Sequence, residues 1–379
     1  ELMDKNLIDL AKQIPIYAEG IKKYVAGEPE AVLMVEFIDE DLDLVRSKIK
    51  DLESLVKNQN QNNHFRNYEN LEDQKEVFEI RKAGLNILMS LKGDKKPVAF
   101  IEDCAVTLDH LADYTSRLKE VFAKYNTNGM FYAHASVGTL HVRPVLNMKS
   151  DQDIKNMKAI AEEAFDMVKE YRGSHSGEHG DGIVRSEFHE KMFGKKILNT
   201  FEEIKDTFDK KNLLNPHKIV RAYKSDDRSL MRYKADYKAE NISTHYDWSE
   251  WGQFSDAVEM CNNNGACRKL DSGVMCPSYR VTKEEKDLVR GRANTLRLAL
   301  SNQLPKDSFV SKEMYKTMEL CVSCKACQRE CPMSVDMAKM KSEFLSHYYK
   351  KFSMGLKDTV ISNMPKLIWL LKITNPIIN

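Results

Sequence analysis

The sequence predicts an α+β protein, in which a region of mixed strands and helices precedes a helical, cysteine-rich region. Strand and helix patterns alternate over about the first two hundred residues, whereas the apolar spacing beyond residue 250 is helical. A polar stretch poor in aliphatic residues lies between them. We therefore expect one domain over residues 1–221, a linker over 222–250, a helical domain over 251–350 and a helical tail over 351–379.

Composition and charge exclude several classes of protein. Lys and Arg number 58 and Asp and Glu number 57, so the net charge of +1 gives no basic excess for nucleic acid. The apolar stretch LIWLLKI (367–373) is far shorter than the roughly 20 residues of a membrane span, and no signal peptide is visible. We therefore expect no transmembrane segment and a cytoplasmic location, with peripheral attachment to the inner face of a membrane as an alternative. The chain begins with ELMD rather than with Met, which suggests a fragment or a processed product.

The first region contains several recognisable elements. AVLMVEFI (31–38) and PVAFIED (97–103) are apolar runs that predict strands. Apolar residues over 42–56 recur at helical spacing, and a further helix is expected to run to Tyr125. Cys104 directly follows the second strand, and a buried structural thiol is its simplest interpretation.

A hairpin and a well-marked helix follow. In GMFYAHASVGTLHVRPVL (129–146), small and turn-prone residues divide two strand-like runs. Ser150 with Asp153 resembles a capping box at the start of a helix. The helix has one apolar stripe, formed by Met157, Ile160, Ala164 and Val168. The domain is expected to end near residues 218–220.

The second region carries a cysteine motif. Seven of the eight cysteines crowd between residues 261 and 331, which indicates metal binding in a reducing compartment. CVSCKACQRECP matches C-x2-C-x2-C-x3-C-P, whose first three thiolates surround one iron–sulfur cluster while the fourth ligates a second cluster. Zinc is the alternative, although zinc sites favour two separated cysteine pairs. Two clusters would move electrons one at a time, so the chain needs a partner that delivers or accepts them.

Crossed ligation requires a second cysteine set with its own Cys-Pro, and Cys276–Pro277 supplies it. We assign the seven cysteines to two clusters by this rule. The first cluster takes Cys321, Cys324, Cys327 and Cys276, and the second takes Cys261, Cys267 and Cys331.

The run CNNNGAC (261–267) places Asn264 where the other run has Cys324. An amide is a poor iron ligand beside thiolate. We therefore expect a three-iron cluster, or a four-iron cluster with one iron not held by cysteine, at a higher potential than its neighbour. The alternative is that this run binds no cluster.

Histidines form a second constellation. His134 and His141 are seven residues apart, and a turn at residues 136–138 would bring both imidazoles to one side. SHSGEHGDG (174–182) adds Glu178 and His179 in a glycine-rich loop. Two imidazoles and a carboxylate are a common set for a catalytic divalent metal. The alternative for each histidine alone is an ordinary polar residue with satisfied hydrogen bonds.

The segments that carry these residues resemble the C-terminal half of FAD-linked D-2-hydroxyacid dehydrogenases, which belong to the vanillyl-alcohol-oxidase-like flavoproteins. The resemblance covers roughly residues 1–345. It rests on ELMD, GEPEAVLMVEF, FIEDCAV, HASVGTLHVRP, SGEHGDG and LLNPHK, and on RKLDSGVMCPSYR and RGRA, which are similar to the fused iron–sulfur domain of long bacterial members.

The resemblance implies a ferredoxin-like α+β substrate or cap domain, followed by an α-helical iron–sulfur domain. It implies that His134, His141 and Glu178 hold zinc or manganese, and that His179 is the base that removes the substrate's hydroxyl proton. Two arginines, Arg81 and more weakly Arg143, would bind the substrate carboxylate, although Arg81 could equally be an ordinary helix-surface charge. In LLNPHK, the residues that would contact FAD are Asn215 and Lys218.

The implied function is oxidation of a D-2-hydroxy acid, of the D-lactate or D-2-hydroxyglutarate type, to the 2-keto acid. Electrons would pass from FAD through the clusters to a quinone or redox protein. No GxGxxG follows a strand, so FAD should be bound mainly by a partner domain or chain. Relatives often have H-x-G-D-G-N-x-H, whereas ASVGT separates the histidines here. The alternative function is a non-catalytic iron–sulfur subunit of a larger redox complex.

Overall fold

An antiparallel sheet organises the first part of the protein. The computed structural model describes residues 1–59, 63–366 and 368. These form two compact units, one over residues 1–237 with 332–334 and the other over the remaining described residues. The sheet has the strand order β2-β1-β5-β6-β3, and β4 also pairs with β6. Its strands are β1 (Leu2–Asp4), β2 (Ala31–Leu33), β3 (Lys96–Pro97), β4 (Cys104–Ala105), β5 (Gly129–His134) and β6 (Thr139–Leu146).

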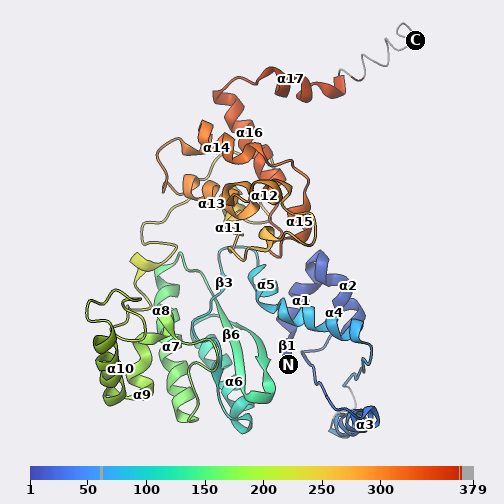
Figure 1. Ribbon diagram of the computed structural model, residues 1–379, viewed down its shortest axis with the longest axis vertical. Coiled ribbons are helices and arrows are strands. Elements are labelled where there is room, and N and C mark those ends of the chain that lie inside the picture. The colour runs from blue at the N-terminus through green and yellow to red at the C-terminus, as the bar shows by residue number, and fades with distance from the viewer. Residues whose placement is uncertain (60–62, 367, 369–379) are drawn as a thin grey trace. The chain divides into compact units, whose positions relative to one another are not determined.

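Helices pack on both faces of this sheet. The helices are α1 (Lys5–Gln13), α2 (Pro15–Tyr24), α3 (Leu42–Gln59), α4 (Leu71–Lys82), α5 (Gly84–Met89), α6 (Leu108–Lys124), α7 (Asp151–Glu170), α8 (Gly182–Arg185), α9 (His189–Phe193) and α10 (Lys195–Phe208). Figure 1 shows α6 and α7 on one side of the strands and α1, α2, α4 and α5 on the other. This mixed architecture confirms the predicted α+β class.

Side-chain alternation along the two central strands creates two cores. Phe131 and Val142 pack in the core shared with α6 and α7. Met130, Tyr132 and Val145 pack in the core shared with α1, α2, α4 and α5. Because residues two apart in a strand share a face, His134 and His141 lie on the same side as this second core.

Both strands predicted from apolar runs are shorter than expected. In the run 31–38 only Ala31–Leu33 pairs, at the edge of the sheet, and Val35 and Ile38 are exposed. In the run 97–103 the backbone leaves the sheet after Pro97. Isolated hydrogen bonds then connect it to β6, for example from the Asp103 N–H to the Leu140 carbonyl oxygen. The apolar composition of this run therefore predicted the burial of Phe100 and Ile101 correctly, but these residues do not pair with another strand.

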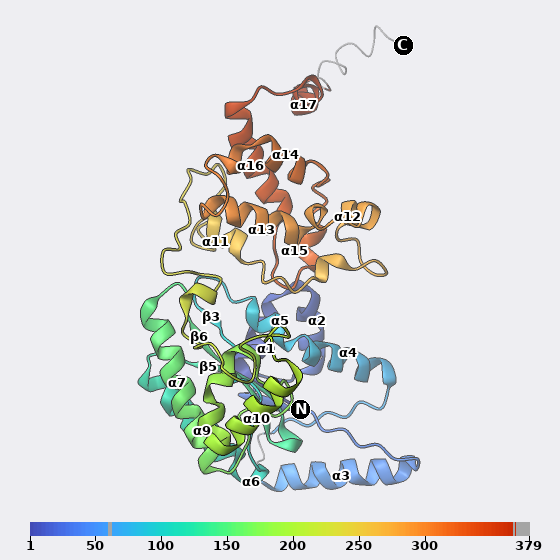
Figure 2. The same cartoon turned by 60° about the vertical axis from the view of Figure 1, so that its left-hand side comes forward.

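The predicted helices form largely as expected. Helix α3 covers the predicted 42–56, lies apart from the other helices in Figure 1 and runs along the bottom of Figure 2, and none of its residues is buried. Helix α6 ends at Lys124, beside the predicted limit. Ser150 caps α7 by accepting a hydrogen bond from the Asp153 N–H at 3.4 Å, and the Asp153 carboxylate accepts in return from the Asn147 N–H at 2.8 Å. The stripe predicted for α7 is buried.

The second unit is helical, as its spacing predicted. Helix α13 contacts α11, α14 and α16, and buries Leu296 and Leu300 in their midst. The helices are α11 (Phe254–Glu259), α12 (Pro277–Thr282), α13 (Val289–Leu300), α14 (Lys312–Glu319), α15 (Ala326–Glu330), α16 (Met337–Lys351) and α17 (Leu356–Ser362). The buried Glu343 carboxylate accepts from the His245 and Tyr246 N–H groups and from the Trp248 indole.

The predicted linker has little regular structure, whereas the described part of the predicted tail contains the helix α17. Over 222–250 the structure forms one short 3-10 helix, Arg228–Leu230. In the tail, α17 buries none of its residues. The segment LIWLLKI lies outside the described residues except for Ile368. Among the helices that the structure describes, none is both long and apolar enough to cross a membrane.

Candidate functional site

A tight turn brings the two histidines of the hairpin together. His134 ends β5 and pairs with Thr139, while His141 lies opposite Tyr132 two residues further along β6. A 3-10 turn over Ala135–Val137 reverses the chain. The two imidazole rings lie 5.0 Å apart between centroids, at 79°. The turn predicted at 136–138 therefore places both rings on one side of the sheet.

This turn depends on Gly138. Its φ of +70° is a conformation that residues with a side chain rarely adopt. A Cβ at this position would lie 1.8 Å from the Val106 carbonyl oxygen. The close approach lets the turn rest against the strand that begins at Cys104, which accounts for the glycine in ASVGT.

A buried carboxylate, that of Asp103, binds the backbone of the loop that carries Glu178 and His179. Asp103 is fully buried and accepts the backbone N–H groups of Glu178 at 2.8 Å and His179 at 2.7 Å. Its other oxygen is paired with the Arg185 guanidinium, which also donates to the Glu102 and Gly180 carbonyls. Although burial acts against ionisation, these hydrogen bonds and Arg185 hold the pKa of Asp103 below its usual value.

Three imidazoles converge on one oxygen of Glu178. The distance from Oε1 is 3.0 Å to the His141 Nε2 atom, 3.3 Å to His179 and 3.6 Å to His134. The His141 and His179 rings are stacked with centroids 5.3 Å apart. The four residues that the sequence singled out therefore form one cluster, here called the histidine cluster.

Burial prepares His141 to act as a ligand. Its side chain is 4% exposed, and desolvation lowers its pKa to about 4 even though Glu102 and Glu178 act in the opposite direction. The ring is therefore neutral near pH 7, which is the form that binds a metal. The Glu102 Oε1 atom lies 3.6 Å from the other ring nitrogen, Nδ1, on the side away from Glu178.

Two buried arginines flank the cluster but differ in their partners. Arg81 pairs with the Glu1 carboxylate at 2.6 Å, and Glu1 in turn contacts the His134 Nδ1 atom at 2.6 Å. The Arg81 guanidinium also lies over the Tyr132 ring. Arg81 is 7% exposed, so it is not an ordinary helix-surface charge. Arg143 pairs with the buried Glu102 carboxylate.

The two residues expected to contact FAD lie elsewhere in the same unit. Asn215 is exposed in the loop after α10, and Lys218 is half-buried in the same loop. No hydrogen bond or ion pair within the described chain joins either residue to the histidine cluster.

The donor set of the cluster fits a divalent metal. The ligand atoms of His134, His141 and Glu178 lie within 4.8 Å of one another. The side chains of Glu178 and His179 are 42% and 45% exposed, whereas His141 is almost fully buried. The cluster is therefore closed on the sheet side and open on the loop side, from which a substrate can approach.

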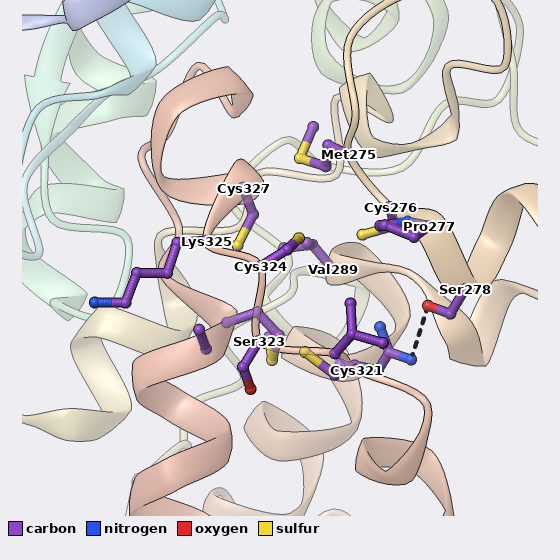
Figure 3. A pocket seen from close by; sticks show the side chains of 14 residues that line it. Met275, Cys276, Pro277, Ser278, Val289, Cys321, Ser323, Cys324, Lys325 and Cys327 are labelled. Carbon is purple, nitrogen blue, oxygen red and sulfur yellow. Dashed lines mark hydrogen bonds between the residues drawn. The ribbon is translucent and has the colours of Figure 1, made fainter.

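Four cysteines line one cavity in the second unit. Cys276, Cys321, Cys324 and Cys327 surround it together with Arg292 and the start of α16 (Figure 3). The cavity is small, with a volume of about 20 Å³. Lys325 points away from it in Figure 3. This is the set that crossed ligation assigned to the first cluster.

The two cysteine runs share one backbone conformation. In the run 321–327, Ser323 and Lys325 have φ values of +54° and +59°. In the run 261–267, the equivalent Asn263 and Gly265 have φ values of +66° and +78°. Alternation of this kind forms a concave nest of N–H groups that suits an anionic centre. The first run therefore retains the cluster-loop conformation despite Asn264.

The Asn264 amide is occupied within its own loop. Its Oδ1 atom accepts from the Ala266 N–H at 2.8 Å, and its Nδ2 atom donates to Asn262 at 2.6 Å. The residue is exposed. The side chain thus stabilises the loop conformation rather than presenting an oxygen to the concave side.

Backbone N–H groups at two helix starts point at cysteine sulfurs. Val289 and Arg290 donate to Cys276 and Cys267, and Met337 donates to Cys327. Burial raises the pKa of Cys276 to about 12 and that of Cys327 to about 11, since each thiol lies among apolar groups and other cysteines. A cysteine ligates a metal as its thiolate, so a bound cation would have to offset this effect of burial.

Sequence reasoning missed the residues that support these sites. Glu102, Asp103 and Arg185 orient the histidine cluster, and the fully buried Arg292 lines the cysteine cavity. Arg292 donates to the Thr317 carbonyl and to Ser278. Charged residues inside an apolar run, such as the pair in FIED, are the signal that could have found them. Cys104 is fully buried, and burial raises its pKa to about 12.

Comparisons with known proteins match a domain family in each of the two parts of the chain. Residues 1–219 match the family described as FAD linked oxidases, C-terminal domain, and residues 257–335 match a 4Fe-4S dicluster domain. A D-2-hydroxyglutarate dehydrogenase from Haemophilus influenzae is 28% identical over 96% of this chain and 39% of its own length. The Escherichia coli protein of the same name is 27% identical over 96% of this chain and 40% of its own length.

A mitochondrial D-lactate dehydrogenase [cytochrome] from Arabidopsis thaliana is 27% identical over 56% of this chain and 37% of its own length. The chain spans about two fifths of the length of the curated relatives that it matches. The family match covers more than half of the chain. The chain therefore belongs to the FAD-linked oxidases, in which it combines the C-terminal domain of that family with a 4Fe-4S dicluster domain.

Proposed function

We propose that this chain is the substrate-binding and electron-relay part of a flavin-dependent D-2-hydroxyacid dehydrogenase. The reaction is oxidation of a D-2-hydroxy acid to the 2-keto acid. The single observation that carries the proposal is the convergence of three imidazoles on the Glu178 carboxylate at 3.0–3.6 Å. A subunit that only relayed electrons would have no use for this arrangement in its first unit.

The residues of the histidine cluster would have different roles in the reaction. His134, His141 and Glu178 would hold zinc or manganese, and the substrate's hydroxyl and carboxylate would meet them from the open loop side. His179 would accept the hydroxyl proton at its Nε2 atom, which faces the same Glu178 oxygen. Arg81, whose guanidinium is buried beside the cluster, would pair with the substrate carboxylate.

When bound, the metal would supply Lewis-acid polarisation of the substrate hydroxyl, FAD would supply a hydride acceptor, and the clusters would supply one-electron carriers. The chain's own residues exclude water from the sheet side, because His141 is buried between Glu102 and the loop. Arg143 neutralises Glu102 there and so acts as a positioning residue. This pairing makes direct contact between Arg143 and substrate the weaker of the two arginine assignments.

The clusters would follow the crossed assignment. Cys276, Cys321, Cys324 and Cys327 line one cavity, which supports a four-iron cluster there. Cys261, Cys267 and Cys331 would hold the second, of three irons or of four with one not held by cysteine. The nest conformation at 261–267 favours this over a run that binds nothing.

FAD would be bound mainly by a partner domain or chain. Exposed apolar side chains along β2 and α3 support this, because Leu33, Leu42 and Leu55 are each more than half exposed. Asn215 and Lys218, which lie in the loop after α10, would be the residues of this chain that contact FAD. A quinone or a redox protein would accept the electrons that leave the clusters.

The substrate panel begins from the relatives that align with both units. Those from Haemophilus influenzae and Escherichia coli are named D-2-hydroxyglutarate dehydrogenase. The test assembles the chain with its FAD-binding part and measures reduction by D-2-hydroxyglutarate, D-lactate, glycolate and the L enantiomers. Turnover of a D-2-hydroxy acid is expected. If no 2-hydroxy acid reduces the flavin, while an external donor reduces the clusters, the non-catalytic subunit is the correct alternative.

A further inference from the structure

A second group of metal-ligating side chains lies behind the loop that carries Glu178 and His179. His175 and Asp181 flank this pair in the sequence, and His189 begins the short helix α9. His175 and His189 are each 1% exposed, and the Asp181 side chain is 14% exposed. None of the three belongs to the histidine cluster described above. Two fully buried histidines beside a largely buried carboxylate need a physical explanation, because buried polar groups are normally hydrogen-bonded.

The three side chains converge closely. The Nε2 atom of His175 lies 3.2 Å from Asp181 Oδ1, and the Nε2 atom of His189 lies 2.7 Å from Asp181 Oδ2. The two rings are perpendicular, with centroids 5.6 Å apart. One ligand atom from each residue lies within 4.8 Å of the other two. Both imidazoles therefore direct a ring nitrogen at the same carboxylate from different sides.

The hydrogen bonds of His189 leave a lone pair facing the carboxylate. Its Nδ1 atom lies 2.8 Å from the Ile219 carbonyl oxygen, so Nδ1 must carry the proton. In the neutral ring, Nε2 then has a lone pair that faces Asp181 Oδ2, which is also an acceptor. A cation or a second proton is needed between them. A carbonyl that fixes the tautomer in this way is the usual support of a metal-bound histidine.

His175 points to the same requirement. Within the described chain, neither of its ring nitrogens has a hydrogen-bond partner, and nor does Asp181 Oδ1. Leaving such buried groups unsatisfied is unfavourable, because each has lost its hydrogen bonds to water. Desolvation lowers the pKa of His175 to about 4, so the ring is neutral near pH 7 and has a lone pair to offer.

The charges around the group would accept a cation. Asp103 and Asp181 carry two negative charges, and Arg185 supplies one positive charge that is committed to Asp103 and to carbonyl groups. Its Nε atom comes no closer than 3.8 Å to Asp181. Apolar rings of Phe165 and Phe193 pack against His175. The charged groups that surround the site thus sum to one net negative charge.

We propose that His175, Asp181 and His189 bind a divalent transition-metal ion of the zinc type, separate from the histidine cluster. Two imidazoles and one carboxylate suit such an ion, and a water molecule or the second Asp181 oxygen would complete a tetrahedral set. This metal binds no substrate. It ties the 174–182 loop to α9 and to the turn at Ile219, and so supports Glu178 and His179 from behind.

The test counts metals in the intact protein that contains this chain. Zinc is added to the anaerobically purified protein, excess metal is removed, and zinc and iron are measured by mass spectrometry. We expect two zinc equivalents in the wild type, one in His175→Gln or His189→Gln, one in His141→Ala and none in the double variant His141→Ala/His189→Gln. His110→Gln, at an exposed histidine, is the matched control and should keep two.

The outcomes separate this inference from the proposed function. If His189→Gln and His175→Gln bind as much zinc as the wild type, the second site does not exist. If only His141→Ala keeps its full zinc, the second site stands and the metal of the proposed function is misplaced. If the variants fail to fold, anomalous diffraction at the zinc edge decides the question on the wild-type protein. A peak between His175 and His189 is expected, and a hydrogen-bonded imidazolium without a peak would overturn the proposal.

Discussion

At the scale of single residues, the histidine cluster is held by buried charges that lie outside it, among them Glu102, Asp103 and Arg185. The cluster itself consists of His134, His141, Glu178 and His179. Its members could be predicted, because the hairpin turn and the adjacent Glu-His pair can be recognised in the sequence. The supporting charges were not visible. Glu102 and Asp103 appear as the polar end of a strand in FIED, and only the fold shows that both are buried. Long-range pairing, as of Asp103 with Arg185, has no local signature.

Replacing His141 by Ala tests the metal of the histidine cluster. The variant should lose one equivalent of divalent metal and most turnover, because His141 is the best-buried ligand and its ring is neutral near pH 7. Visible absorption of the clusters should not change, since they are bound by residues of another unit. Metal analysis of wild type and variant makes the comparison, and equal metal contents would show that the site is misassigned.

Replacing His179 by Ala tests the general base. The rate of flavin reduction should fall by about a hundredfold or more, because a base acts in the transition state. Substrate binding should weaken far less. Stopped-flow reduction of the assembled protein over a range of substrate concentrations separates the two effects. Identical reduction rates in wild type and variant would make His179 a bystander.

At the scale of elements, helices were predicted more accurately than strands. Helix α7 follows its apolar stripe and its cap, both of which are local properties. The strands β2, β3 and β4 are two or three residues long and depend on partners distant in the sequence. The apolar runs 31–38 and 97–103 therefore indicated burial or sheet proximity without giving strand length. Positive φ values in the cysteine runs also became visible only in the fold.

Gly138→Ala tests the hairpin turn as an element. The substitution combines a strained positive φ with a contact of 1.8 Å to the Val106 carbonyl oxygen, so it should destabilise by about 1–3 kcal/mol or more. Gly93→Ala is the matched control, because Gly93 has a φ of +84° but no atom within 4 Å of an added Cβ. Urea unfolding measures both. Equal destabilisation would mean that the contact with Val106 has no role.

Asn264→Cys tests the cluster loop. Because the loop already has the same backbone conformation as the run with Cys324, the new thiol should complete the ligand set. The EPR spectrum should change from that of a three-iron to that of a four-iron cluster, or a labile iron should become firmly held. Iron and sulfide analysis with EPR on anaerobic protein provides the measurement. Only four irons in the wild type, with one cluster signal, would contradict the two-cluster assignment.

At the scale of the whole molecule, the fold class and the two candidate cofactor-binding regions could be predicted from the sequence. The choice of substrate could not. An α+β region followed by a helical cysteine-rich region is readable from periodicity and from C-x2-C steps. The chain covers about two fifths of relatives named D-2-hydroxyglutarate dehydrogenase. Under the proposed function, the FAD-binding part would complete the wall of the substrate site, and substrate choice would depend on that wall.

The most direct test of the central claim is rapid-freeze EPR on the assembled protein after anaerobic mixing with a D-2-hydroxy acid. The account predicts that D-2-hydroxyglutarate or D-lactate bleaches the flavin and then produces signals of reduced clusters, and that the L enantiomer does neither. The same protein with His141→Ala should retain clusters that dithionite reduces. A flavin that stays oxidised with every D-2-hydroxy acid, or clusters that stay oxidised after the flavin is reduced, would contradict the account.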